Sequence, residues 1–314
     1  MNVWIWALLL SPATLSFQVL HPKSGYSKEL IHIAALALFC ILLREFKITA
    51  VVSTSILTAA MVLGVLSHEE VFFYAPYFFA ALVLGGRSAT EALKECAIPA
   101  ISGLVVIWIC SNHIGNVQIA TGICTSLGYK FIVAGSQEVC GSGAIPYLMR
   151  SREYARAETL SNIYHYQYFA IFPFFAALGL LPAVGESLVL VRTRLKRDVI
   201  IVWLSVSASF IGTLVLFYYA YDWGRWIYVH MASIGILLTF LDGKAFASSD
   251  VTAGKVVGTA PGRRIAYAAF LFAYATLWIL PNGIEPIRFG YISRALYLSH
   301  LKAHATAETR EPVN

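Results

Sequence analysis

The sequence predicts an all-α integral membrane protein, a polytopic bundle of transmembrane helices with one longer outer loop. Of its 314 residues, 58% are hydrophobic and only 13% are charged, whereas about a quarter of the residues of a soluble domain carry a charge. Apolar segments that approach the roughly 20 residues needed to span a bilayer recur along the whole chain. We therefore expect residues 1–314 to form a single membrane domain, and the composition excludes an ordinary soluble enzyme.

The apolar periodicity predicts nine membrane spans, of which the second, fourth and eighth are short. The first has no basic residue before its apolar run and is interrupted by Pro12, so it is not typical of a signal peptide. A layout with eight spans, in which the first does not cross the membrane, remains an alternative. The nine segments are 3–20, 29–43, 48–66, 71–84, 96–111, 166–184, 199–221, 226–241 and 265–281.

Basic residues alternate between the connecting loops, and the positive-inside rule places the basic set in the cytoplasm. The turns at 67–70 and 222–225, the loop at 112–165 and the tail at 282–314 then face the periplasm of a bacterial inner membrane, and the end of the tail is expected to be disordered. The net charge of +6 therefore does not indicate a nucleic-acid partner. The basic set is Arg44, Lys47, Arg87, Lys94, Arg192, Arg194, Lys196, Arg197, Lys244, Lys255, Arg263 and Arg264.

Cys124 and Cys140 share the predicted outer loop. In an oxidising periplasm they can form a disulfide, but two cysteines in one loop can equally stay reduced, because sequence separation does not establish the required geometry. No cysteine or histidine spacing is typical of a zinc site, and no nucleotide-binding or nucleophile-elbow motif occurs. We therefore expect neither a metal nor another cofactor.

The turn Ser67-His68-Glu69-Glu70 places two carboxylates and an imidazole between the third and fourth predicted spans. One interpretation is a capping box, in which Ser67 caps the next helix and Glu70 reaches back to it. Capping leaves His68 and Glu69 unexplained. Because partial desolvation raises the pKa of a carboxylate toward neutral pH, such a group can act as a general base. We therefore predict that Glu69 and His68 are catalytic.

A second polar group, DWGRW at 222–226, lies between the seventh and eighth predicted spans. Arginine presents a planar fork to phosphate or carboxylate groups, and ionisable residues at membrane depth usually have a function. The alternative is an aromatic belt at the interface with an ion pair three residues apart. We predict that Asp222 and Arg225 are catalytic and that sugar rings stack on Tyr221, Trp223 and Trp226.

The outer loop ends in a basic segment that precedes the aromatic run YHYQY at 164–168. At helical spacing, Arg152 and Arg156 share one face, which can hold a diphosphate. A solvated helix with internal ion pairs is the alternative interpretation. The tail adds a further arginine in a segment with glycine and proline. The predicted substrate-binding residues here are Arg150, Arg152, Arg156, His165 and Arg288.

Together, the Ser67-His68-Glu69 turn, the outer loop with cysteines and the DWGRW segment at 222–226 resemble bacterial inner-membrane proteins of surface polysaccharide synthesis, similar to Wzy-type O-antigen and exopolysaccharide polymerases. The resemblance implies transfer of a growing glycan from undecaprenyl diphosphate to another lipid-linked repeat unit, at the periplasmic face and without a nucleotide or metal. It also implies contact with other polysaccharide-assembly proteins and membrane lipids.

Under this resemblance Glu69, with His68, removes the proton of the acceptor hydroxyl, and Arg225 neutralises the diphosphate leaving group together with Arg152 or Arg156. Two other functions remain: a flippase or exporter component for lipid-linked glycans, and a non-catalytic scaffold. Scarce mid-span charges and the absence of inverted repeats weigh against an ion-coupled transporter. A glycosyltransferase of the GT-C kind is a further alternative, but those enzymes usually carry acidic residues in a first large outer loop, which is basic here.

Overall fold

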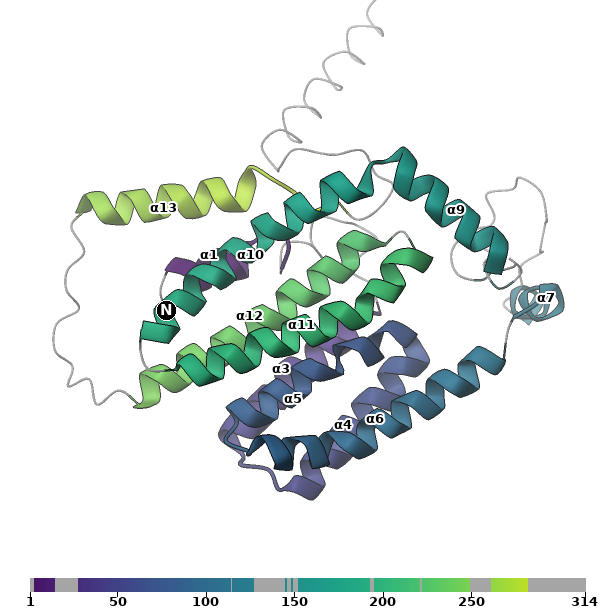
Figure 1. Ribbon diagram of the computed structural model, residues 1–314, viewed down its shortest axis with the longest axis horizontal. Helices are drawn as coiled ribbons and strands as arrows, with labels where there is room; N and C mark the ends of the chain where they lie inside the picture. Colours follow the sequence, from purple (N-terminus) through teal and green to yellow (C-terminus); the bar gives the residue numbers. More distant parts are fainter. Residues whose placement is uncertain are drawn as a thin grey trace, which may run out of the picture.

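The computed structural model describes residues 3–14, 28–113, 115–126, 145, 148, 152–192, 195–220, 222–248 and 261–281. Every regular element in these residues is a helix, which confirms the predicted all-α class (Figure 1). In chain order the helices are α1 (Val3–Leu10), α3 (Leu30–Glu45), α4 (Ala50–Ser67), the 3₁₀ helix η2 (Glu69–Tyr74), α5 (Ala75–Leu84), α6 (Ala89–Asn112), α7 (Val117–Ser126), α9 (Arg152–His165), α10 (Tyr168–Arg192), α11 (Lys196–Tyr219), α12 (Trp223–Ser248) and α13 (Pro261–Thr276).

Five of the described helices, α4, α6, α10, α11 and α12, are long and apolar enough to cross a membrane. Each of the nine predicted spans overlaps a helix, but α1, α3, α5 and α13 are shorter than a full crossing. Nine crossings are therefore not confirmed, whereas a helical membrane protein agrees with the structure.

The first and fourth predicted spans differ from the helices that form. Helix α1 ends at Leu10, because the proline that follows lacks the N–H of a continuing helix. The hydroxyl of Thr14 then donates to the carbonyl of Leu8 at 2.5 Å and closes the end of the helix. In the fourth span, α5 starts with a proline in its first turn, so the 3₁₀ helix η2 precedes it and the crossing is broken.

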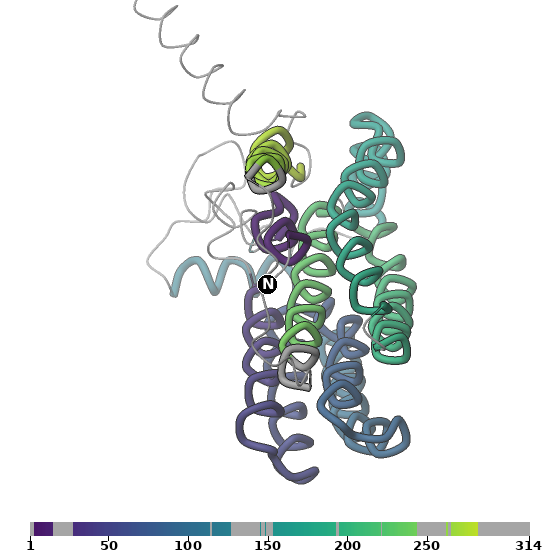
Figure 2. Tube along the Cα trace, turned by 90° about the vertical axis from the view of Figure 1, so that its left-hand side faces the viewer, coloured from purple at the N-terminus to yellow at the C-terminus, as the bar shows by residue number. Residues whose placement is uncertain are grey.

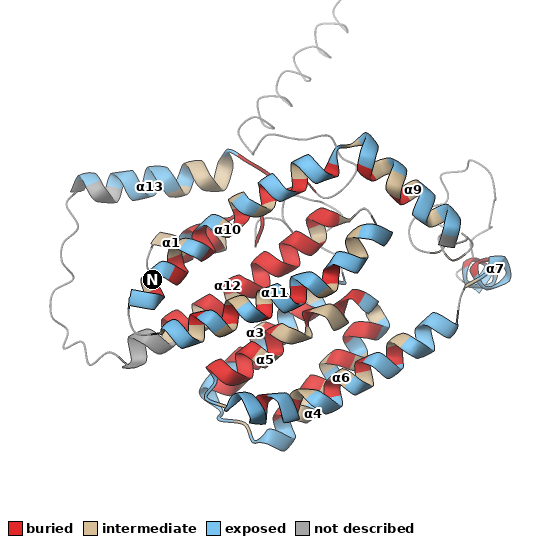
Figure 3. Ribbon diagram, viewed as in Figure 1, coloured by how far each residue is buried: buried red, intermediate tan, exposed pale blue. Residues whose placement is uncertain are grey.

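Figure 3 shows exposed residues along α4, α6 and α10, and many of the exposed residues on the long helices are large and apolar. Exposed large side chains include Leu63 on α4, Ile101 on α6 and Leu204 on α11. A water-soluble protein rarely exposes a continuous apolar surface of this kind. These faces therefore suit contact with lipid.

Helix α12 is the centre of the bundle and contacts α1, α3, α5, α10 and α11. In the apolar segment of α12, 78% of the residues are buried, whereas in the apolar segments of the other four long helices at most 44% are buried. Figure 2 shows α1 between α13 and α12, and α1 contacts both. On that side Gly185 of α10 admits Trp4 of α1, since an added Cβ would lie 2.5 Å from the indole Cδ2.

The ends of the helices gather at two poles of the bundle. Helix α3 begins, α4 ends and α12 begins at one pole, which we call the site pole. At the opposite pole, the end of α3, the segment before α4 and the C-terminal parts of α5 and α12 line a pocket of about 440 Å³. Arg44, Lys47 and Arg87 line this pocket, so basic residues predicted to share one side do lie together.

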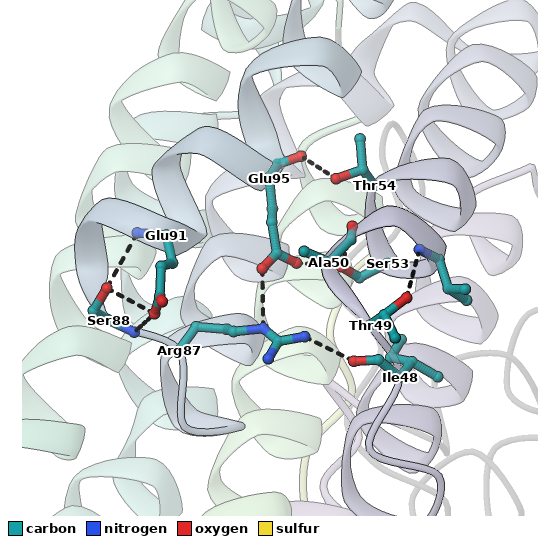
Figure 4. A network of polar contacts seen from close by, with 10 residues as sticks. Ile48, Thr49, Ala50, Ser53, Thr54, Arg87, Ser88, Glu91 and Glu95 are labelled. Carbon is teal, nitrogen blue, oxygen red and sulfur yellow. Dashed lines mark hydrogen bonds and ion pairs between the residues drawn. The ribbon is translucent and has the colours of Figure 1, made fainter.

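A polar network at the opposite pole joins α4, α6 and the segment between α5 and α6 (Figure 4). The Nε atom of Arg87 lies 2.9 Å from a carboxylate oxygen of Glu95, and the guanidinium also donates to the carbonyl of Ile48 at 2.7 Å. The hydroxyl of Ser53 donates to the other carboxylate oxygen of Glu95. Glu95, only 6% exposed, is thus held by two partners near the membrane boundary.

Candidate functional site

Three segments that are distant in the sequence meet at the site pole. Glu29 lies immediately before α3, His68 follows α4, Glu70 belongs to η2, and Arg225 lies in the first turn of α12. The extended backbone of His68 ends α4 and lets η2 turn back against it. Gly64 makes this turn possible, since an added Cβ would lie 2.7 Å from the Cγ1 atom of Val71.

Arg225 lies between two carboxylates. Its Nη1 atom is 3.2 Å from Oε1 of Glu29, and its Nη2 atom pairs with the carboxylate of Asp222. The predicted pair three residues apart on α12 therefore forms. The side chain of Glu29 is 1% exposed and that of Arg225 is 27% exposed, so the guanidinium connects a buried carboxylate to the surface.

Glu70 is fully buried and receives a hydrogen bond from the indole Nε1 of Trp226 on α12. The Nδ1 atom of His68 lies 3.6 Å from Oε2 of Glu70 and 4.0 Å from Oε2 of Glu69. Glu69 itself is 69% exposed. Of the two neighbouring glutamates, one therefore faces the inside of the protein and the other faces outward.

The buried environment shifts both groups of the boundary turn toward their neutral forms. Burial, with a contribution from the carboxylate of Glu29, raises the pKa of Glu70 to about 8. Burial also lowers the pKa of His68, although the carboxylates of Glu69 and Glu29 act in the opposite direction. Desolvation thus disfavours charge on these side chains more strongly than their neighbours restore it.

Several buried polar atoms of this cluster have no hydrogen-bond partner in the structure. A buried polar atom without a partner costs about 1–3 kcal/mol, and a native protein that retains such atoms requires an explanation. In the described residues, the unpaired atoms at the site pole are both carboxylate oxygens of Glu29, Nδ1 of His68, Oε1 of Glu70, the hydroxyl of Tyr74 and Nε of Arg225.

A second polar layer lies beneath the cluster. The ring of Tyr74 packs against His32 and His230, with centroids 5.0 and 5.3 Å apart. His32 Nε2 lies 3.1 Å from the hydroxyl of Ser233. His230 is held on both sides, by the hydroxyl of Tyr77 at 2.6 Å and by that of Thr213 at 3.0 Å.

The capping interpretation of the boundary turn is wrong. His68, not Ser67, is the N-cap of η2, and it makes no side-chain capping bond. Glu70 instead enters the cluster, while Glu69 stays at its exposed edge. Sequence reasoning also missed Glu29, whose only signal is an acidic residue directly before an apolar run, and it missed the buried His32 and His230.

The two tryptophans of the DWGRW segment are core residues in this structure. Trp223 is 6% exposed and its ring contacts those of Tyr168, Phe169, Phe172 and Phe217. Trp226 is 3% exposed. Both rings are thus buried, and Trp223 also lines the apolar groove between α9, α10, α11 and α12.

The other predicted binding residues lie apart from the cluster or outside the described residues. Arg156 of α9 donates to the hydroxyl of Tyr218 and lies over its ring, 4.8 Å from the centroid. His165 is exposed at the end of α9 beside Tyr166. Cys124 is disulfide-bonded. Arg150, Tyr221, Arg288, Cys140 and the side chain of Arg152 lie outside the described residues.

An apolar groove lies one aromatic layer away from the cluster. It has a volume of about 400 Å³ and runs between α9, α10, α11 and α12, where Phe217 and Tyr218 form part of its lining. The ring of Phe217 also contacts that of Trp226, which donates to Glu70. The groove and the charged cluster are therefore neighbours.

Comparison with known proteins adds no relative: no protein-family model, curated protein or solved structure matches the chain. The functional argument therefore rests on the residues of the site pole.

Proposed function

We propose that this chain is a membrane glycosyltransferase that polymerises lipid-linked oligosaccharide repeat units at the site pole. The observation that carries the proposal is the buried cluster of Glu29, His68, Glu70 and Arg225 at the ends of membrane helices. Burying ionisable groups at the ends of membrane helices costs free energy, and such groups usually mark functional sites. A cluster that contains carboxylates, an imidazole and a guanidinium has the groups that glycosyl transfer from a diphosphate requires.

In the proposed reaction, the bond between the sugar C1 and the diphosphate oxygen of the donor breaks. A hydroxyl of the acceptor sugar forms the new glycosidic bond and releases its proton, and undecaprenyl diphosphate leaves. Arg225 is partly exposed and is held from one side by Asp222. Its guanidinium would stabilise the negative charge that develops on the diphosphate.

Glu69 is the carboxylate of the turn that an acceptor sugar can reach, because it is exposed whereas Glu70 is enclosed. We assign to Glu69 the role of accepting the hydroxyl proton, with the imidazole of His68 beside it at 4.0 Å. Glu70 and Glu29 then have a different role inside the cluster.

The neighbouring groove supports a substrate with a long hydrocarbon chain. Its lining is apolar and aromatic, and Arg156 lies over Tyr218 of that lining. A polyprenyl chain in the groove, with its diphosphate near Arg156, would bring the reacting sugar close to the cluster. The basic residues at the opposite pole favour a cytoplasmic location for that pole, which would leave the site pole in the periplasm of a bacterial inner membrane.

The test is the size distribution of lipid-linked surface glycan in the native host. The gene is deleted and then restored as wild type, Arg225→Ala or Glu69→Gln, with membrane levels matched by immunoblot. We expect single repeat units to accumulate in the deletion and in both variants, and only wild type to restore long chains. Normal chain lengths in the deletion strain would rule out a polymerase.

The same strains separate the alternatives. Loss of an exporter component would leave the lipid-linked glycan on the cytoplasmic side, where an externally added glycosidase cannot reach it, whereas loss of a polymerase leaves single units accessible. A scaffold would tolerate Glu69→Gln and Arg225→Ala without any change in chain length.

A further inference from the structure

Three potential metal ligands converge within the cluster. Glu29, His68 and Glu70 each offer one ligand atom, and these atoms all lie within 4.8 Å of one another. They come from two places in the sequence: Glu29 is the residue before α3, and His68 and Glu70 belong to the turn between α4 and η2. The approach of Glu29 to this turn is thus a product of the tertiary fold.

The ligand atoms are also left unsatisfied by the protein. Both carboxylate oxygens of Glu29, which is 1% exposed, lack a hydrogen bond, although Arg225 lies at ion-pair distance from one of them. Oε1 of the fully buried Glu70 and Nδ1 of His68 likewise have no hydrogen-bond partner. Buried acceptors that face one another without donors between them are groups that a bound cation would satisfy.

The charge balance of a metal-bound site is consistent with a divalent cation. With Glu29, Glu70 and Asp222 as carboxylates in that state, the guanidinium of Arg225 compensates only one of three negative charges. Uncompensated buried charges are expensive. A divalent cation between the two glutamates would make this group of side chains neutral as a whole.

We propose that Glu29, His68 and Glu70 bind one divalent transition-metal ion, of the Zn²⁺ or Mn²⁺ class. A set of two carboxylates and one imidazole suits these ions, whereas Mg²⁺ and Ca²⁺ prefer oxygen ligands alone. Three protein ligands leave a coordination position open, as in catalytic metal sites. The side chain of His68 is 24% exposed, so the open position has access to solvent.

The required rearrangement is small. In a tetrahedral site with bonds of about 2.1 Å, ligand atoms lie about 3.4 Å apart. His68 Nδ1 and Glu70 Oε2 are already 3.6 Å apart. Arg225 is also paired with Asp222, so it would keep one carboxylate partner if that of Glu29 turned toward the ion. The resemblance to Wzy-type polymerases implies a reaction without metal, so the ion would distinguish this chain from them.

Metal binding does not depend on the proposed reaction. If the chain does act on a lipid diphosphate, the open position would receive a diphosphate oxygen, and only that step rests on the proposed function. The experiment therefore measures metal content and not glycan, so that its result and the result for polymerisation stay separate.

The full-length protein is purified in detergent, treated with chelator, and dialysed against micromolar Zn²⁺ or Mn²⁺, and the bound metal is measured by mass spectrometry. We expect one ion per chain in the wild type. Glu29→Gln and Glu70→Gln should weaken binding at least tenfold, as judged by titration against a competing chelator. Glu69→Gln is the matched control, because this residue belongs to the same turn but not to the three ligands, and its metal binding should be unchanged.

Size-exclusion profiles show which variants fold. His68→Gln, which removes the imidazole but retains a polar side chain, provides a further variant if a glutamate substitution fails to fold. A wild-type protein that binds no stoichiometric Zn²⁺ or Mn²⁺ would overturn the proposal without any variant. Equal binding by the wild type and the ligand variants would place the ion elsewhere and overturn it as well.

Discussion

The indole of Trp226 donates a hydrogen bond to the buried carboxylate of Glu70, and so connects the first turn of α12 to the 3₁₀ helix η2. The two residues are 156 positions apart in the chain. Because α12 is the central helix of the bundle, this contact sets the position of the boundary turn relative to Arg225, which lies one residue before Trp226.

Trp226→Phe should destabilise the protein by about 1–3 kcal/mol, because it leaves a buried carboxylate without its donor. The measurement is thermal unfolding in detergent, followed by the fluorescence of the remaining tryptophans. Trp108→Phe is the control, since Trp108 is 67% exposed on α6 and its loss should leave the unfolding temperature nearly unchanged. Equal unfolding temperatures for the two variants would mean that the contact contributes nothing.

At the opposite pole, Arg87→Ala should destabilise the protein by about 3 kcal/mol, because it leaves the buried carboxylate of Glu95 without its cation. The double variant Arg87→Met with Glu95→Gln removes both charges and should recover most of that loss. Chemical unfolding of the three proteins provides the comparison, and Lys94→Met, at an exposed position, is the control. A double variant that is less stable than Arg87→Ala would contradict this account.

The contact between α1 and α10 predicts an overpacked variant. Gly185→Ala places a Cβ against the indole of Trp4 and should cost about 1–3 kcal/mol. Trp4→Leu frees that space, so the double variant should suffer less from the added methyl group than the wild-type background does. A double-mutant cycle on unfolding free energies measures this coupling, and additive effects would show that α1 does not pack there.

The state of the cysteines predicts how many thiols react with a labelling reagent. Cys40, Cys96 and Cys110 are free and Cys124 is disulfide-bonded, in a chain with five cysteines. The pairing of Cys124 with Cys140 stays a prediction. Maleimide labelling of the unfolded protein, read by intact mass, should add three labels without reductant and five after reduction. A fourth label before reduction, on a monomeric protein, would contradict an intramolecular partner.

The orientation can be measured with single cysteines in a background whose three free cysteines are serine. A cysteine at Glu69 should react with an impermeant maleimide added outside spheroplasts. A cysteine at Glu45, at the end of α3, should react only after the membrane is opened. The reverse pattern would place the site pole in the cytoplasm and contradict the positive-inside assignment.

Much of the helical framework was predictable because apolar runs are strong signals. The segments predicted at 48–66, 166–184 and 199–221 lie inside or close to α4, α10 and α11, since a run of apolar residues has few ways to satisfy its backbone other than a helix. The predicted helix boundaries were wrong where single residues determined them. The proline after α1 ended that helix early, and η2 replaced the first turns of α5.

The polar residues of the site were predictable as candidates but not as an arrangement. The boundary turn and the DWGRW segment stand out in an apolar chain, and the structure does bring His68 and Arg225 into one cluster. The side of η2 that faces inward depends on how it turns after His68, and this determined that Glu70 and not Glu69 is enclosed. The amino-acid composition does not determine which side of η2 faces inward.

By itself, the sequence determined that the chain forms apolar helices and that its basic residues are concentrated in alternate loops, because hydrophobicity and charge are properties of each segment alone. Only the tertiary structure brought Glu29 to within reach of His68, Glu70 and Arg225. These contacts depend on how α3, α4 and α12 pack against one another. Contacts between distant segments are set by the shapes of whole helices, which no local pattern of residues encodes.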